Sequence, residues 1–577
     1  MSLRYVIFLL AAYVYVMYLL GFRVFWIQFT LLHMNADVLV TIPKGTIRGR
    51  KEYSLRNISF YAFQEIPFAK PPVGELRFRD AQPEEGWEGI LDATKNTKVC
   101  YQQSNIYNEA NLTLMENEDC LYLNVYTPMY PTSEASLPVM FYIYGGGFVN
   151  GAANFAYFGP HYFMEHDVIV VTANYRVGPF GFLATGDLVS PGNYGLKDQL
   201  LALKWVNQNI KYFGGDPEKV TIFGQSAGAA SVNFHLMSKQ SEGLFRASIA
   251  QSGSILCPWV YQKDYKNIAY DLASYVDSNF QRNSSSEELL RFLRNVPASD
   301  LKKAAASYPA QMMNDQITQG FVFAVTIEPE HENAFITESM YEAVEKGHIN
   351  RVPMMIGTCS EEAITFATNI HDFEWSTRQL DNNASKLVNN NMHLTDPNQL
   401  EAAGEAIRRI YTDGPLADDL GKAVRYHSDT SFTRGIIRYA QMQSKFSDIY
   451  FYQFSHYGPI IGDRPNIEGA YKVGHSDDNA FIWTYGNWSG MNYQKPEDIL
   501  TSNRYTTLFT NFAKYLDPTP EPSSLFDNID WPTVDPDNFQ YLDINDTLTI
   551  KKNPKGDVFP KWVEVYEQMA IKPYTTF

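Results

Sequence analysis

The sequence predicts an α/β fold, in which a central, mostly parallel sheet is flanked by helices within a single large domain. Runs typical of buried strands alternate with a segment of helical period between residues 138 and 252. One run, Val220–Gln225, meets a Gly-x-Ser-x-Gly motif, and small helix-forming residues follow at once. No Gly/Ser-rich or Pro-rich linker divides the middle of the 577-residue chain. We therefore expect one unit rather than several.

The amino-acid composition excludes several classes of protein. Hydrophobic residues make up 45% of the chain and aromatic residues 15%, which supplies a large core and excludes disorder. The formal net charge of −17 repels nucleic acids and anionic lipids, so neither is an expected partner. Four cysteines are too few for a disulfide scaffold in a chain of this length.

The N-terminus resembles a secretory leader. Arg4 precedes an apolar run from Tyr5 to Gly21, and a second apolar patch follows Arg23. We read residues 1–35 as a signal peptide or, alternatively, a retained signal-anchor, with the catalytic domain in residues 36–577. Six sequons agree with a secreted protein, and membrane anchoring through the N-terminus is the alternative. The glycosylation candidates are Asn57, Asn111, Asn283, Asn383, Asn487 and Asn545.

The predicted elements begin with a hairpin over Val38–Arg50, whose turn lies at Lys44-Gly45. A proline-stiffened loop covers residues 66–78, and residues 118–128 predict a strand ended by Pro128. The segment between Cys100 and Cys120 is polar, as expected of a surface loop. In an oxidising compartment these two cysteines are the first pair expected to form a disulfide.

Pro138–Tyr144 predicts a buried strand that runs into Gly145-Gly146-Gly147. Three glycines after a strand allow several backbone N–H groups to point into one small volume, which suits an oxyanion hole. An ordinary glycine turn is the alternative. The Gly-x-Ser-x-Gly motif downstream favours the oxyanion hole.

Val168–Thr172 predicts the next strand, and Leu196–Tyr212 a helix that ends before the Val220–Gln225 strand. Within the motif, Gly224 and Gly228 leave room where a Cβ atom would clash in a sharp strand-to-helix turn. Such a turn lifts Ser226 off the strand end as a nucleophile, with amides of the following helix start near its oxyanion.

The second half of the chain gives weaker signals. Helical periods occupy residues 260–350 and 375–445, and strands are predicted at Leu244–Ser252, Val352–Gly357 and Asp448–Ser455. A Pro-rich surface loop is expected over residues 517–537, before a terminal helix at Pro560–Met569.

A serine nucleophile needs a base, and histidine suits that role near neutral pH. Among eleven histidines, His475 lies in a loop of small residues after the late strand, where α/β sites assemble. When serine sits on such a turn, the orienting acid lies between serine and histidine in the chain. Glu361 and Glu362 both follow a strand there. They cannot both face the imidazole, so one is expected to be a solvated surface charge, and the residues alone do not choose between them.

These motifs resemble the type-B carboxylesterase family, the carboxylesterase/cholinesterase group of α/β-hydrolases, over nearly the whole chain after the leader. The most specific pieces are Glu118–Asn124, Tyr144–Phe148, Asn193–Gln199 and Phe213–Pro217. The resemblance implies the α/β-hydrolase fold, a Cys100–Cys120 disulfide, and no metal or organic cofactor. It implies the catalytic residues Ser226, Glu362 and His475 and the oxyanion donors Gly146, Gly147 and Ala227. Ala363 stands where the family usually has glycine.

Within the family, Gln225 is informative about the charge of the substrate. Many members carry glutamate before the serine, and a neutral amide weakens attraction for a cationic substrate. The Cys100–Cys120 loop also contains no Trp that could face a cation. A set of short motifs is similar to the pattern of insect juvenile hormone esterases: Arg77-Phe78, Asp198-Gln199, Gly224–Gly228, Glu362 and Gly474–Asp477. This resemblance implies a small, hydrophobic and uncharged terpenoid methyl ester as substrate. The alternatives are a broad-specificity or odorant-degrading carboxylesterase and a non-catalytic adhesion protein.

Two further expectations concern the remaining cysteines and one pair of opposite charges. Cys257 matches a second disulfide cysteine of many family members, but no partner follows it, so Cys257 and Cys359 are expected to be unpaired. Arg176 and Asp198 lie inside apolar motifs and are expected to form a structural ion pair.

Overall fold

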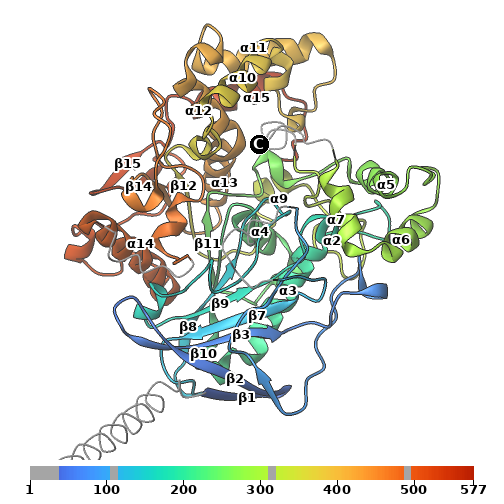
Figure 1. Cartoon of the computed structure of the whole chain (residues 1–577). Coiled ribbons are helices and arrows are strands. Elements are labelled where there is room, and N and C mark those ends of the chain that lie inside the picture. The colour runs from blue at the N-terminus through green and yellow to red at the C-terminus, as the bar shows by residue number, and fades with distance from the viewer. Residues whose placement is uncertain (1–37, 104–114, 309–319, 486–494) are drawn as a thin grey trace, which may run out of the picture.

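The computed structural model describes residues 38–103, 115–308, 320–485 and 495–577 (Figure 1). The predicted leader, residues 1–35, lies outside these ranges, as do the sequons at Asn111 and Asn487. None of the helices within the ranges is both long enough and apolar enough to cross a bilayer.

A sheet of 13 strands forms the centre of the described part of the chain. Its order is β1-β2-β3-β7-β9-β8-β10-β11-β12-β13-β14-β15, with β4 paired to β2, while β5 and β6 form a separate pair. The strands are β1 (Val38–Ile42), β2 (Gly45–Tyr53), β3 (Ser59–Pro67), β4 (Ile90–Asp92), β5 (Lys98–Val99), β6 (Met115–Glu116), β7 (Tyr122–Thr127), β8 (Leu137–Ile143), β9 (Ile169–Ala173), β10 (Gly215–Gln225), β11 (Ala247–Gln251), β12 (Met354–Cys359), β13 (Ile449–Phe454), β14 (Gln540–Ile544) and β15 (Leu548–Lys552).

The strands from β9 to β14 in this order pair parallel, and antiparallel strands extend both edges. The parallel strands consist largely of buried apolar residues, as expected of a sheet that is covered on both faces. Because the strands are parallel, β8, β10, β12 and β13 all end at one edge of the sheet. This edge is where α/β folds assemble their sites.

The helices surround the sheet, and those from α10 to α12 gather with α15 at the top of Figure 1. Their bounds are α2 (Gly178–Phe182), α3 (Tyr194–Asn209), α4 (Ala227–Met237), α5 (Tyr265–Val276), α6 (Ser286–Asn295), α7 (Ala298–Ala306), α9 (Met340–Lys346), α10 (Ile370–Asp381), α11 (Pro397–Tyr411), α12 (Leu420–Ser428), α13 (Arg434–Gln443), α14 (Pro496–Tyr515) and α15 (Phe559–Met569).

Helices α4 and α14 cover opposite faces of β10. A Cβ atom on Gly224 would lie 2.6 Å from the Gly228 carbonyl carbon of α4, whereas the adjacent Phe223 packs edge-on against Phe509 of α14. Successive strand residues point to opposite faces, so the two helices sandwich the strand. This arrangement confirms the predicted α/β fold with a mostly parallel sheet flanked by helices.

The predicted elements before α4 are confirmed with shifts of a few residues, including the opening hairpin. The β14–β15 hairpin and α14 were not predicted from the sequence. The expected surface loop at residues 517–537 also differs, because its Trp531 is buried and packs edge-on against Tyr450 and Tyr452 of β13. This loop therefore closes part of the core.

Candidate active site

Ser226 lies between the end of β10 and the start of α4, with φ 58° and ψ −123°. A non-glycine residue rarely adopts a positive φ, so the surrounding packing must hold this turn. The Ser226 amide donates a hydrogen bond to the Gln251 carbonyl at the end of β11, at 2.8 Å. A Cβ atom on Gly228 would lie 2.0 Å from the Ile143 carbonyl oxygen, so the turn requires glycine there.

The three residues predicted to be catalytic come together at the carboxyl edge of the sheet. His475 Nε2 lies 2.8 Å from Ser226 Oγ, and His475 Nδ1 lies 2.7 Å from Glu362 Oε2. The His475 amide also donates to the Glu362 carbonyl oxygen at 2.9 Å. These contacts form an unbroken chain of hydrogen-bonding groups from hydroxyl to carboxylate, with the geometry of a nucleophile, a base and an orienting acid.

The two adjacent glutamates both point inward. Glu362 follows β12, and its Oε1 accepts a hydrogen bond from the Cys359 amide at 2.7 Å. Glu361 was expected to be a solvated charge if it did not face the imidazole, and this expectation is wrong. Its side chain is fully buried and accepts a hydrogen bond from Ser428 Oγ at 2.8 Å. Ser428, the last residue of α12, therefore holds Glu361, the residue next to the proposed acid Glu362.

The glycine loop after β8 faces the nucleophile. A Cβ atom on Gly145 would lie 2.9 Å from Ser226 Cβ, and Gly146 and Gly147 have φ values of 114° and 60°. Across the described residues, no group accepts a hydrogen bond from the amides of Gly146, Gly147 or Ala227. Three donors beside the serine, one of them at a helix N-terminus, suit an oxyanion.

A buried polar network lies behind the imidazole. Asp478 Oδ2 accepts hydrogen bonds from Gln251 Nε2 and Tyr505 Oη, each at 2.8 Å. Burial raises the pKa of the Asp478 carboxyl, and these two hydrogen bonds oppose the shift. Neither Asp478 nor Gln251 was predicted from the sequence to have a role in the site. Asp478 follows His475 closely in the sequence, and Gln251 is the last residue of β11. These two positions are the signal that could have identified the residues.

The structure has the disulfide, the unpaired cysteines and the ion pair that were expected from the sequence. Cys100 and Cys120 form a disulfide, whereas Cys257 and Cys359 are free and buried. Burial raises the pKa of the Cys257 thiol to about 12, so it is protonated and unreactive at neutral pH. Arg176 Nη2 lies 2.7 Å from Asp198 Oδ1 in a buried pair that joins the residues after β9 to α3.

Four sequons lie in the described ranges. Asn57, Asn283 and Asn383 are exposed, and Asn545 is half-buried in the turn between β14 and β15. In the same ranges, no group of three or more His, Cys, Asp or Glu side chains could hold a metal ion.

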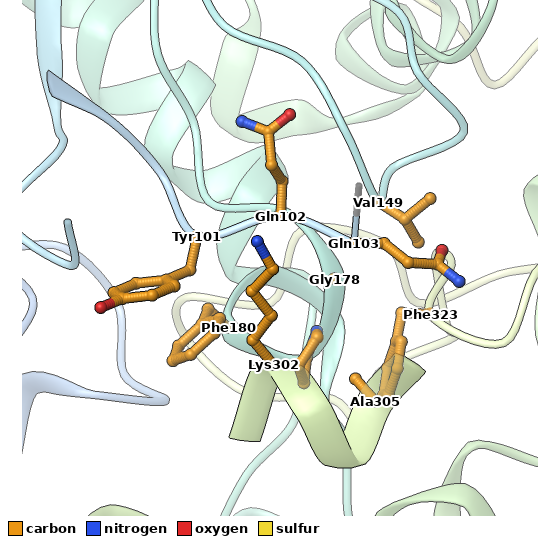
Figure 2. Close-up of a pocket in the computed structure, with 10 residues that line it drawn as sticks. Tyr101, Gln102, Gln103, Val149, Gly178, Phe180, Lys302, Ala305 and Phe323 are labelled. Atoms are coloured by element: carbon orange, nitrogen blue, oxygen red, sulfur yellow. The ribbon is translucent and has the colours of Figure 1, made fainter. Parts of the chain in front are cut away.

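A small, mostly apolar pocket adjoins the oxyanion loop (Figure 2). The Gly178 amide donates to the Phe148 carbonyl at 2.7 Å, which joins the lining of the pocket to the glycine loop. Lys302 reaches in from α7, and its Nζ pairs with Glu116 Oε1 at 2.7 Å. The lining residues are Tyr101, Gln102, Gln103, Val149, Gly178, Pro179, Phe180, Lys302, Ala305 and Phe323.

Comparisons with known proteins show what the chain as a whole is similar to. A profile of the carboxylesterase family matches residues 36–562. The chain is 33% identical over 541 residues to a juvenile hormone esterase of Tribolium castaneum, with 88% of each chain covered. It is 32% identical over 519 residues to venom carboxylesterase-6 of Apis mellifera, covering 88% of this chain and 90% of that protein. The crystal structure of the Manduca sexta juvenile hormone esterase, with OTFP covalently attached, matches with a TM-score of 0.81 and 27% identity, covering 92% of this chain and 100% of that one.

Proposed function

Because the chain belongs to the carboxylesterase family and is a carboxylic-ester hydrolase, we propose that it cleaves esters through Ser226, His475 and Glu362. The observation that carries this proposal is the hydrogen-bonded chain from Ser226 Oγ through the imidazole to the Glu362 carboxylate. Residues 36–577 form the catalytic domain in this proposal.

In the first step, His475 Nε2 takes the proton of Ser226 as the serine oxygen attacks the ester carbonyl. Glu362 holds the Nδ1–H tautomer and stabilises the imidazolium that forms. The amides of Gly146, Gly147 and Ala227 donate to the oxyanion of the tetrahedral intermediate. The imidazolium then protonates the departing alcohol, and an acyl-enzyme remains on Ser226.

In the second step, His475 takes a proton from water, and the resulting hydroxide equivalent attacks the acyl-enzyme carbonyl. The same three amides stabilise the second oxyanion. Its collapse releases the carboxylic acid, and the proton returns to Ser226 Oγ. The sequence of steps consumes one water per ester and returns the enzyme to its starting state.

We propose that the physiological substrate is the methyl ester of juvenile hormone, a hydrophobic terpenoid. Two relatives that carry the name juvenile hormone esterase support this choice. The neutral Gln225 beside the serine suits an uncharged ester better than a cationic one.

The substrate proposal is tested by hydrolysis of juvenile hormone and of a short p-nitrophenyl ester, with the wild type and with Ser226→Ala. Efficient, saturable hydrolysis of the hormone that the substitution abolishes is the expected result. Fast turnover of the short ester with poor hydrolysis of the hormone contradicts the hormone as substrate. Turnover of either ester by Ser226→Ala contradicts the role of the serine.

A broad-specificity or odorant-degrading carboxylesterase is the second candidate. The venom carboxylesterase of Apis mellifera is almost as similar to this chain as the juvenile hormone esterase of Tribolium castaneum is. Similar kcat/KM values across acyl chains of many shapes favour this candidate. An adhesion protein is disfavoured because all three proposed catalytic residues are present and in contact.

We also propose that the protein is secreted after its 1–35 leader directs it into the secretory pathway. The charged start, the apolar run and the sequons support this localisation. Recovery of active, glycosylated enzyme from the medium of insect cells is the expected result. Retention of the full-length chain in the membrane fraction supports the signal-anchor instead.

A further inference from the structure

A π-helical turn, Asp429–Thr433, interrupts the helix that runs from α12 into α13. The Arg434 amide donates to the Asp429 carbonyl five residues earlier, instead of to the residue four earlier. Single π-turns are rare and weaken a helix locally, so they persist where the displaced side chains do something useful. All five residues of the turn are buried.

The turn places Phe432 against the proposed base. The Phe432 ring lies 4.3 Å from the His475 ring, centroid to centroid, with 32° between the planes. Phe366 lies farther from the imidazole, at 6.0 Å, and packs on Phe432. One face of the imidazole is therefore packed against the phenyl ring.

The residue that precedes the turn contacts the acid loop. Ser428 Oγ donates to Glu361 Oε1 at 2.8 Å and accepts from the Ala363 amide at 3.0 Å. These two contacts lie on either side of Glu362. One helical segment thus touches both the acid loop and the base, although neither belongs to it.

The segment after β11 fixes the turn from the other side. The Trp259 Nε1–H donates to the Ser431 carbonyl at 2.8 Å, and the Cys257 thiol lies 3.7 Å from the Phe432 carbonyl oxygen. A Cβ atom on Gly435 would lie 2.9 Å from the Leu256 carbonyl oxygen, so α13 approaches this segment closely. Two carbonyl groups of the irregular turn therefore have partners in the buried segment after β11.

We propose that the π-helical turn is a positioning element for the Ser226–His475–Glu362 site, in which Phe432 and Ser428 are positioning residues. This inference rests on the proposed function. Phe432 limits the rotation of the imidazole, and its π face stabilises the imidazolium that forms while the serine attacks. Ser428 holds the Glu361 side chain on one side of Glu362 and the Ala363 amide on the other. The π-turn contains one residue more than a turn of regular α-helix. Without that residue, the side chains of α13 would be rotated by about 100° relative to those of α12.

The test compares Phe432→Leu with Phe539→Leu, a buried phenylalanine that packs on Phe451 of β13. For hydrolysis of a short p-nitrophenyl ester, Phe432→Leu lowers kcat by about three- to tenfold, the size expected for loss of one aromatic pair. KM changes by less than about twofold, because the effect acts through the base. Phe539→Leu leaves kcat unchanged. Phe432→Tyr keeps the ring and retains most of the wild-type kcat.

A double-mutant cycle with His475→Ala identifies the route of the effect. If Phe432 acts through the imidazole, Phe432→Leu changes the residual hydrolysis of His475→Ala by less than about twofold. An equal loss in both backgrounds, or an unchanged kcat in the wild-type background, overturns the proposal. Ser428→Ala provides a second measurement if Phe432→Leu does not fold, and an unchanged kcat there also overturns it.

The two proposals fail in different ways. If Ser226→Ala and His475→Ala retain wild-type turnover, the proposed catalytic residues are wrong. If these variants are inactive while Phe432→Leu and Ser428→Ala keep the wild-type kcat, the catalytic residues stand and the positioning element does not.

Discussion

At the scale of single residues, neighbouring carboxylates have separate tasks. Glu362 contacts the imidazole, whereas Glu361 is held by Ser428 and by the Tyr471 amide at 3.4 Å. Both side chains are buried, so exposure does not distinguish them. The hydrogen-bond partner does.

This difference predicts unequal effects of removing each charge. Glu362→Gln lowers kcat by about 10³-fold or more, because an amide can hold the wrong tautomer and no longer stabilises the imidazolium. Glu361→Gln keeps an oxygen that accepts from Ser428, and it lowers kcat by less than about tenfold. Initial rates with a p-nitrophenyl ester measure both. Equal losses in the two variants contradict the assignment.

Asp429 carries a pH dependence of stability. Burial raises its pKa from 3.8 to about 6, which corresponds to about 3 kcal/mol. The folded state therefore binds this proton more tightly than the unfolded state. The resulting stability is fully present below about pH 4 and is lost as the pH rises through about 6.

Asp429→Asn removes this titration but keeps an oxygen for the Tyr411 hydroxyl, which lies 3.0 Å from Asp429 Oδ2. We expect the variant to gain unfolding free energy relative to the wild type between pH 4 and pH 7. Urea unfolding at several pH values measures the difference. A difference that stays constant over this range contradicts the prediction.

At the scale of elements, a buried ion pair joins α3 to the segment after β9. Arg176 donates to both carboxylate oxygens of Asp198, and burial raises the pKa of that carboxyl against the effect of the guanidinium. Removing one charge from such a pair leaves the other desolvated.

Arg176→Met therefore lowers the unfolding free energy by about 3–5 kcal/mol. Arg378→Met is the matched control, because Arg378 pairs with Glu374 within α10 and its side chain is 51% exposed. The control costs less than about 1 kcal/mol. Chemical denaturation compares the two, and similar losses would show that burial of the pair does not matter.

Whether an element could be predicted from the sequence depends on how clear its local apolar pattern is. Leu137–Ile143 and α15 were found because their apolar patterns are local. Helix α14 was missed because buried Arg504 and Asp498 interrupt its apolar face. Strand β15 is short and mostly exposed.

The same reasoning applies to the site. Ser226 and the glycine loop belong to local motifs, and His475 follows from loop context and chain order. By contrast, Phe432 approaches the imidazole from a distant helix through a π-turn, and no local pattern marks that contact. The resemblance to the family selected Glu362 over Glu361, which the residues alone left open.

At the scale of the whole molecule, the accessible sequons predict where glycans attach. The exposed Asn57, Asn283 and Asn383 are expected to be modified. The half-buried Asn545 is expected to stay largely free, because its side chain bonds the Asp546 amide at 2.9 Å. Enzymatic deglycosylation in heavy water, followed by peptide mass spectrometry, measures the occupancy of each site. High occupancy at Asn545 contradicts this ranking.

The order of the proposed active-site residues along the chain also determines when each of them is synthesised. Ser226 precedes its proposed base by 249 residues. At a translation rate of about 5–20 residues per second, the serine emerges roughly 10–50 s before His475. During that interval the nascent chain has the proposed nucleophile without its proposed base. The enzyme thus acquires its reactivity late in synthesis, after most of the parallel sheet has been made.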